Sequence, residues 1–179
     1  MGDRVMPEAG RKLFDALIRE CRRRLMDESL PRIRKCLAEL SEEELWLRPN
    51  EQSNSVGNLV LHLCGNVGQY VLSGLGGAAD HRERPREFSE RGPIPRADLL
   101  ARLERTMADA AKVLDRLDPA TILDKQTVQG FEYDGVGILV HVVEHFSYHT
   151  GQIAYVVKAR KGIDLGFYRG VNLNVTKRT

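Results

Sequence analysis

The stretch from about Tyr133 to Lys161 constrains the fold more than any other part of the chain. It has helix-forming length and no interior proline. Large aliphatic and aromatic side chains fall on most sides of the helix that it would form, and such a helix must be buried by its neighbours. The sequence therefore predicts a helical bundle that buries this last helix, with a second subunit as a further source of cover.

Three further long helical patterns precede this stretch, and no segment shows convincing strand alternation. Their apolar residues recur every three to four positions. Pro31 is predicted to kink or divide the first helix, whereas Ser41 and Ser55 are predicted to cap a short helical turn and the second long helix. The predicted fold is all-α, a four-helix bundle with long helices at about 8–40, 55–72, 97–117 and 133–161.

The crossover between the second and third long helices is about 20 residues long and is highly charged from His81 to Phe88. Loops of this length are unusual in a compact domain and often cover a site or an interface. The crossover is also long enough to run the length of the bundle, so the two helices that it joins could be parallel. We expect a single domain over residues 1–179, with its core at about 8–162 and a short polar tail over 163–179.

Charge and composition argue against several classes of protein. The formal net charge is only +2, and basic residues are interleaved with acidic ones, so no nucleic-acid partner is expected. The three cysteines form no CxxC pair and are odd in number, which argues against a disulfide framework. No signal peptide and no apolar run of membrane-spanning length are recognised, so a cytoplasmic protein without a membrane partner is expected.

Three of the five histidines, His141, His145 and His149, recur at i, i+4 and i+8 in the last helix. Each step of four residues drifts by roughly 40° around a helix, so the imidazoles share one broad face. Neighbouring Cβ atoms on that face are about 6 Å apart. Because two imidazoles one turn apart can bind one metal ion without distorting the backbone, this spacing predicts a metal site.

A third imidazole from the second helix could complete that site. His62 lies in a polar stripe with Asn58 and Asn66, either of which could orient it through its second ring nitrogen. Three protein ligands leave coordination positions for water or substrate, as in catalytic metal sites. Three neutral ligands also leave the charge of the ion uncancelled, which favours ionisation of a bound water or thiol.

The residues alone leave two pairings open in the last helix. His141-Val-Val-Glu144-His145 matches the H-x-x-E-H pattern of inverted zinc proteases, with Glu144 as the base. That interpretation needs a further carboxylate ligand and a protease cleft, and neither is recognisable. In the other pairing His145 and His149 bind the metal, and His141 supports the ligands or packs beside them.

Two segments of the chain resemble the DinB-like superfamily, whose members are also called YfiT-like metal-dependent hydrolases. The resemblance covers roughly residues 14–163, and the charged segment that ends in Glu87-Phe88 resembles a bacterial subgroup without an assigned function. The matching segments are Asn54-Ser-Val-Gly-Asn58-Leu-Val-Leu-His62-Leu and Glu144-His145-Phe-Ser-Tyr-His149-Thr-Gly-Gln152-Ile.

The resemblance implies a four-helix bundle, often dimeric, in which the second and third helices are parallel. It also implies a divalent ion, zinc or nickel among others, bound by one histidine of the second helix and an H-x3-H pair of the last. In this sequence those ligands are His62, His145 and His149. Some members are thiol-dependent transferases or isomerases, in which the metal activates a low-molecular-weight thiol, and others are described as hydrolases.

The working hypothesis is therefore a homodimeric, metal-dependent small-molecule hydrolase or thiol-dependent transferase. The catalytic residues are not identified, and the candidates are Gln152, Glu144 and Tyr148. Gln152 lies about 20° off the ligand face and could hydrogen-bond a ligand or substrate, Tyr148 could reach the mouth of the site, and Glu144 lies about 100° around the helix from His145. The main alternative is a metal-binding or structural dimer without catalysis, and a metalloprotease is a more distant one.

Overall fold

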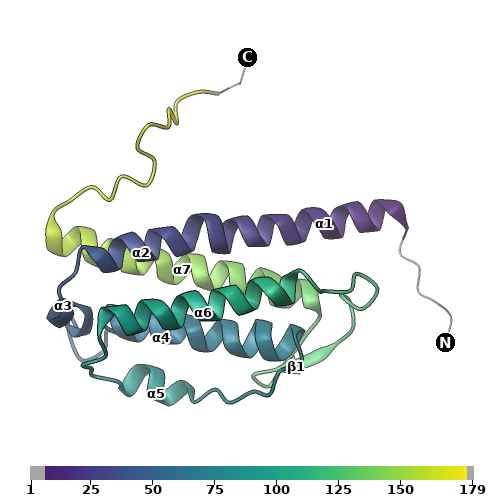
Figure 1. Ribbon diagram of the computed structural model, residues 1–179, viewed down its shortest axis with the longest axis horizontal. Helices are drawn as coiled ribbons and strands as arrows, with labels where there is room; N and C mark the ends of the chain where they lie inside the picture. Colours follow the sequence, from purple (N-terminus) through teal and green to yellow (C-terminus); the bar gives the residue numbers. More distant parts are fainter. Residues whose placement is uncertain (1–6, 177–179) are drawn as a thin grey trace.

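The long helices of the molecule lie side by side along its longest axis (Figure 1). The structure is a computed structural model that describes residues 7–176, so the first six and last three residues of the predicted domain lie outside it. The described part is mostly helical, which confirms the all-α prediction at this level. Its helices are α1 (Glu8–Arg22), η1 (Arg23–Ser29), α2 (Leu30–Ala38), α3 (Glu42–Trp46), α4 (Val56–Val67), η2 (Gly68–Leu75), α5 (Arg84–Ser89), α6 (Arg96–Leu114) and α7 (Gly135–Lys161).

The first long stretch is continuous through α1, η1 and α2, and the wider π-helical hydrogen bonding of η1 precedes Pro31. Proline has no N–H to donate into the preceding turn, so a change of hydrogen bonding at this point is expected. Two predicted caps are present. The side chains of Ser41 and Ser55 accept hydrogen bonds from the backbone of Glu44 and Asn58, and each pair forms a capping box.

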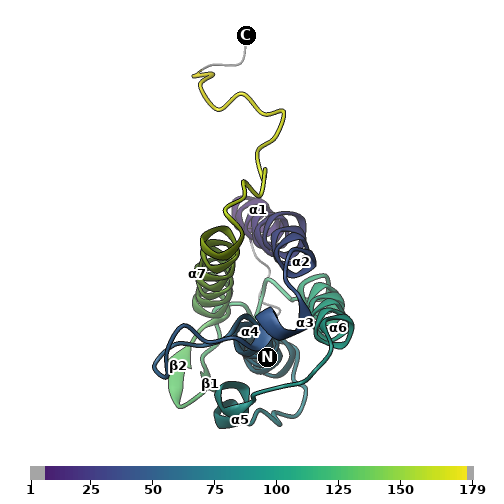
Figure 2. The same ribbon diagram turned by 90° about the vertical axis from the view of Figure 1, so that its left-hand side faces the viewer.

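Within a single chain, the helix that is buried on all sides is α4 and not the last helix. Every residue of α4 except Gly65 is buried. Figure 2 shows α4 between α6 and α7, with α5 on the side away from α1 and α2. In contrast, α7 leaves Val140, Tyr148 and Tyr155 more than half exposed. Cover of this face of α7 by a second subunit stays a prediction. The burial of α4 was not predicted because the crossover covers a face of α4, which the apolar pattern of each helix alone does not reveal.

The crossover segment, residues 76–95, runs back along the length of α4 before the chain enters α6 (Figure 1). As a result, the chain enters α4 and α6 at the same end of the molecule. The segment contains the short helix α5, which the sequence analysis treated as loop. Its path places charged residues of the crossover directly against the middle of α4.

A small hairpin precedes α7, where the sequence predicted no strand. Strands β1 (Gln126–Val128) and β2 (Phe131–Tyr133) are antiparallel, and Val128 pairs with Phe131. The two turn residues, Gln129 and Gly130, both have positive φ, as this kind of two-residue turn requires. Strands of three residues are too short to show alternation, which explains why the hairpin was missed.

Trp46 packs between the start of α4 and the end of the crossover segment. A Cβ atom placed on Gly57 of α4 or on Gly92 of the crossover would come within 2.8 Å and 2.7 Å of the indole ring, respectively. The indole Nε1 donates a hydrogen bond to the carbonyl oxygen of Ile94 at 3.2 Å. The indole therefore fills the space that side chains would take at two glycines far apart in sequence.

The hydrophobic core lies between the long helices and extends past the predicted boundary at residue 162, because Leu165 is almost fully buried. Beyond this point the described part of the tail extends away from the helices (Figure 1). None of the helices between residues 7 and 176 has both the length and the apolar character needed to cross a membrane.

Candidate metal centre

Three histidines from two helices converge at one point of the structure. His62 comes from α4, and His145 and His149 come from α7, one turn apart. One potential ligand nitrogen of each lies within 4.8 Å of the others, so the group could hold a metal ion. The Nε2 atoms of His62 and His145 are 2.9 Å apart. The structure thus brings together the three residues that the sequence singled out as ligands.

The second ring nitrogen of His62 is held by a carboxylate from the crossover segment. Its Nδ1 lies 2.7 Å from Oε2 of Glu87, and both side chains are buried. Because a carboxylate accepts hydrogen bonds, Nδ1–H donates and the lone pair of Nε2 is left facing His145. Burial opposes ionisation of Glu87, but the bonds from His62 and Arg82 outweigh it and lower the pKa of this carboxyl group.

The second ring nitrogen of His149 is held from within α7. Its Nδ1 donates to Oε1 of Gln152 at 2.7 Å, which leaves Nε2 free for a metal ion. Gln152 was expected to contact a ligand or substrate, and it contacts this histidine. Two of the three imidazoles therefore have one nitrogen fixed by a neighbour and the other turned towards the same point, the arrangement that metal-binding histidines require.

His141 lies beside the group of three and is not part of it. Its Nε2 is 3.2 Å from Nδ2 of Asn66. The side-chain amide of Asn66 is therefore hydrogen-bonded to His141 and not to His62. The ring of His141 stacks on Tyr70 and on His145, with centroid distances of 4.1 Å and 5.4 Å. This placement fits the interpretation in which His141 packs beside the ligands.

Asn58 also has partners other than His62. Its Nδ2 donates to the carbonyl oxygens of Glu87 and Glu90, each at 2.9 Å, and its Oδ1 accepts from Arg48 at 2.8 Å. Asn58 therefore ties the crossover segment to α4. The second ring nitrogen of His62, which Asn58 or Asn66 could have held, is held by Glu87, whose position 25 residues after His62 gave no local signal.

The remaining candidates lie at the surface. The ring of Tyr148 is 5.1 Å from that of His149, but Tyr148 is 62% exposed. Glu144 faces solvent, and its charge partly offsets the effect of burial on the pKa of His141. No contact among residues 7–176 gives either residue a catalytic role.

The thiols of the protein itself are unsuited to react at this site. Cys21, Cys36 and Cys64 are free and buried. Burial raises the pKa of each thiol to about 11, so the reactive thiolate is scarce near neutral pH. A thiol that reacts here would have to come from outside the chain.

Burial keeps His145 and His149 neutral. It lowers the pKa of His145 to about 3, with help from the nearby His149 and His62, and it also lowers the pKa of His149. Neutral imidazoles are the form that binds metal ions. Near neutral pH, protons therefore compete only weakly for these two nitrogens.

The lowered pKa of His145 makes the stability of the metal-free protein fall in acid. The unfolded chain takes up protons on His145 below about pH 6.5, whereas the folded protein resists them until about pH 3, so stability is full above pH 6.5 and falls as the pH drops. We expect the free energy of unfolding to fall by on the order of 1 kcal/mol from pH 7 to pH 5 on account of His145, allowing for its partial exposure.

Urea unfolding of the metal-free protein at both pH values measures this effect. A His145→Gln variant should lose that part of the pH dependence, whereas His81→Gln, which removes a histidine from the crossover surface, should keep it. An equal pH dependence in the His145→Gln variant and the parent would contradict the assignment.

The fold and the site together define a helical protein with a three-histidine group suited to a metal ion. Residues 15–167 match the family described as "Protein of unknown function (DUF1572)", and the chain belongs to this family. No curated protein and no solved structure matches the chain significantly. The family description specifies no activity, so a function has to be argued from the site itself.

Proposed function

We propose that His62, His145 and His149 bind a divalent metal ion, zinc or nickel, and that the protein catalyses a metal-dependent transfer or hydrolysis of a small molecule. The observation that carries the proposal is the convergence of three imidazoles on one point. Glu87 and Gln152 hold the outer nitrogens of two of them, as the outer partners of metal-binding histidines do.

A bound divalent ion would supply Lewis acidity, which favours the ionised form of a water or thiol beside it. The protein fixes the geometry of the three nitrogens and provides no carboxylate among them, so the positive charge of the ion is not cancelled by its ligands. His145 is only partly buried, and the small molecule is proposed to approach the ion from its side. Because the cysteines of the chain are buried, a low-molecular-weight thiol is the proposed co-substrate.

The finer features of the fold belong to the same proposal. The side-by-side helices and the common entry end of α4 and α6 support a DinB-like four-helix bundle with parallel second and third helices (Figure 1). The exposed Val140, Tyr148 and Tyr155 of α7 would then lie in a homodimer interface. A cytoplasmic location agrees with free cysteines and is part of the proposal.

An open coordination position can be tested with the cobalt-loaded protein and 2-mercaptoethanol as the probe. We expect the thiol to produce a new near-ultraviolet absorption band from sulfur bound to cobalt, and to shift the visible cobalt bands. The thioether 2-(methylthio)ethanol, which has no ionisable S–H, should produce neither change. An unchanged spectrum up to high thiol concentration would indicate a closed site and favour the non-catalytic, metal-binding alternative.

A further inference from the structure

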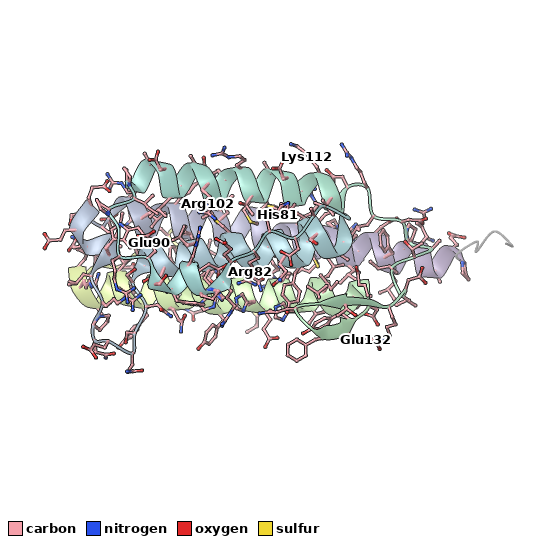
Figure 3. All side chains as sticks on the ribbon, turned by 90° about the horizontal axis from the view of Figure 1, so that it is seen from below. His81, Arg82, Glu90, Arg102, Lys112 and Glu132 are labelled. Atoms are coloured by element: carbon pink, nitrogen blue, oxygen red, sulfur yellow. The ribbon has the colours of Figure 1, made fainter. Side chains whose placement is uncertain are left out.

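The geometry points to Glu87 as the residue that positions His62 for metal binding, with Arg82 holding Glu87 in place. The inference rests on the proposed metal site and extends it: the crossover segment, which provides no ligand, would determine how one ligand binds. Figure 3 looks onto the side of the molecule that carries α5 and shows Arg82 near its middle.

Glu87 and Arg82 form a buried, two-point ion pair. Arg82 Nε lies 2.7 Å from Oε1 of Glu87, and Arg82 Nη2 lies 2.9 Å from Oε2, the oxygen that also accepts from His62. The side chains of Arg82 and Glu87 are 4% and 8% exposed. With both oxygens occupied and both groups buried, the carboxylate is fixed next to Nδ1 and points away from the ligand nitrogens.

The sequence of α4 makes room for this carboxylate at Gly65. A Cβ atom on Gly65 would lie 1.8 Å from Oε1 of Glu87 and 2.9 Å from Nε of Arg82. The ion pair therefore occupies the volume that a side chain would take one turn after His62. Glycine in the interior of a helix is about 1 kcal/mol less favourable than alanine. Alanine at this position would therefore suit the helix better, but its side chain would exclude the ion pair.

The backbone of the crossover segment is held at the same place by other contacts. Asn58 donates to the carbonyl oxygen of Glu87. The ring of Phe88 packs against the ring of His62, with centroids 4.7 Å apart. The backbone that carries the carboxylate is thus anchored at Glu87 itself and, through the next side chain, against His62, as a positioning role requires.

The Glu87→Gln substitution tests the role because glutamine keeps the shape of the side chain and has only one oxygen. Arg82 has no acceptor capacity and donates to both carboxylate oxygens, so a single oxygen that stays with its Nε leaves the amide NH2 facing Nδ1 of His62, where Nη2 of Arg82, 3.2 Å away, is a second donor. The imidazole would then have to carry its proton on Nε2, the nitrogen needed for the metal ion. The substitution should therefore favour the wrong tautomer of His62.

The experiment compares Glu87→Gln with Glu83→Gln, which removes a carboxylate of the same segment that pairs with Arg86 at the surface. Nitrogen-15 NMR of the metal-free proteins reports the tautomer of His62, whose signal is assigned by its loss in His62→Ala. Zinc affinity is measured by competition with a chromophoric chelator. We expect Glu87→Gln to move the proton of His62 to Nε2 and to lower zinc affinity by about 10- to 100-fold, and Glu83→Gln to change neither.

A second variant, Gly65→Ala, keeps all three polar groups and displaces the carboxylate sterically. It should reproduce both effects, and it decides the question if Glu87→Gln does not fold. An unchanged tautomer and a zinc affinity within twofold of the parent in the folded variants would overturn the inference. Failure of the parent to bind any metal would count against the proposed function alone, because the tautomer of His62 is read without metal.

Discussion

The His149→Ala variant is expected to lose stoichiometric metal during purification. The substitution removes one of only three nitrogens that converge at the site, and no other His, Cys, Asp or Glu among residues 7–176 joins that group. The loss of affinity should exceed the roughly 10- to 100-fold typical of replacing an outer partner of a ligand. Elemental analysis of the untagged protein measures it, beside a His62→Ala variant that should behave in the same way.

The matched control is His141→Ala, because it removes the same side chain from the same helix, two turns before His149. Its Nε2 faces Asn66, so its loss should leave metal content nearly unchanged. The opposite pattern, with metal lost in His141→Ala and retained in His149→Ala, would favour the H-x-x-E-H pairing and contradict the assignment made above. Retention in both variants would place the metal elsewhere.

The Asn58→Ala variant is expected to lose about 3 kcal/mol of stability. Asn58 is fully buried and bonds the carbonyl oxygens of Glu87 and Glu90 and the guanidinium of Arg48. Truncation would deprive the carbonyl oxygen of Glu87 and the backbone N–H of Ser55 of their buried bonds to Asn58, and each such group costs about 1–3 kcal/mol unless water reaches it. Urea unfolding of the metal-free protein measures the change.

Asn50→Ala provides the comparison for this effect. The side chain of Asn50 also accepts local hydrogen bonds, from Gln52 and Ser53, but it does so in an exposed turn. Its loss should cost less than about 1 kcal/mol, because water replaces the lost bonds. A cost below about 1 kcal/mol for Asn58→Ala as well would mean that the crossover segment is not anchored through this residue.

Residues close in sequence made much of the site predictable. The four-residue spacing of His145 and His149 places them on one helix face, and helical periodicity requires that face to be buried against another helix. His62 was the natural partner because it is a histidine in another helix, within a stripe of polar residues on an otherwise largely apolar helix. The side-chain caps at Ser41 and Ser55 were also predictable, since they depend on residues within one turn.

Features that depend on the path of the crossover segment could not be predicted in this way. The contact between Glu87 and His62 joins residues 25 positions apart, and no periodicity relates them. The burial of α4 on all sides has the same origin, because α5 covers a face that the helix pattern alone leaves unassigned. Gly65 was a possible clue, but a glycine within a helix indicates close packing without revealing which residue approaches.

The position of Trp46 makes its fluorescence a probe of the contact between α4 and the crossover segment. Trp46 is the single tryptophan of the chain, and its indole touches both α4 at Gly57 and the end of the crossover segment at Gly92. Any movement of that segment away from α4 would bring water to one face of the indole and shift its fluorescence emission. The seating of the segment that carries Glu87 can therefore be followed in real time, in the unmodified protein and without an attached dye.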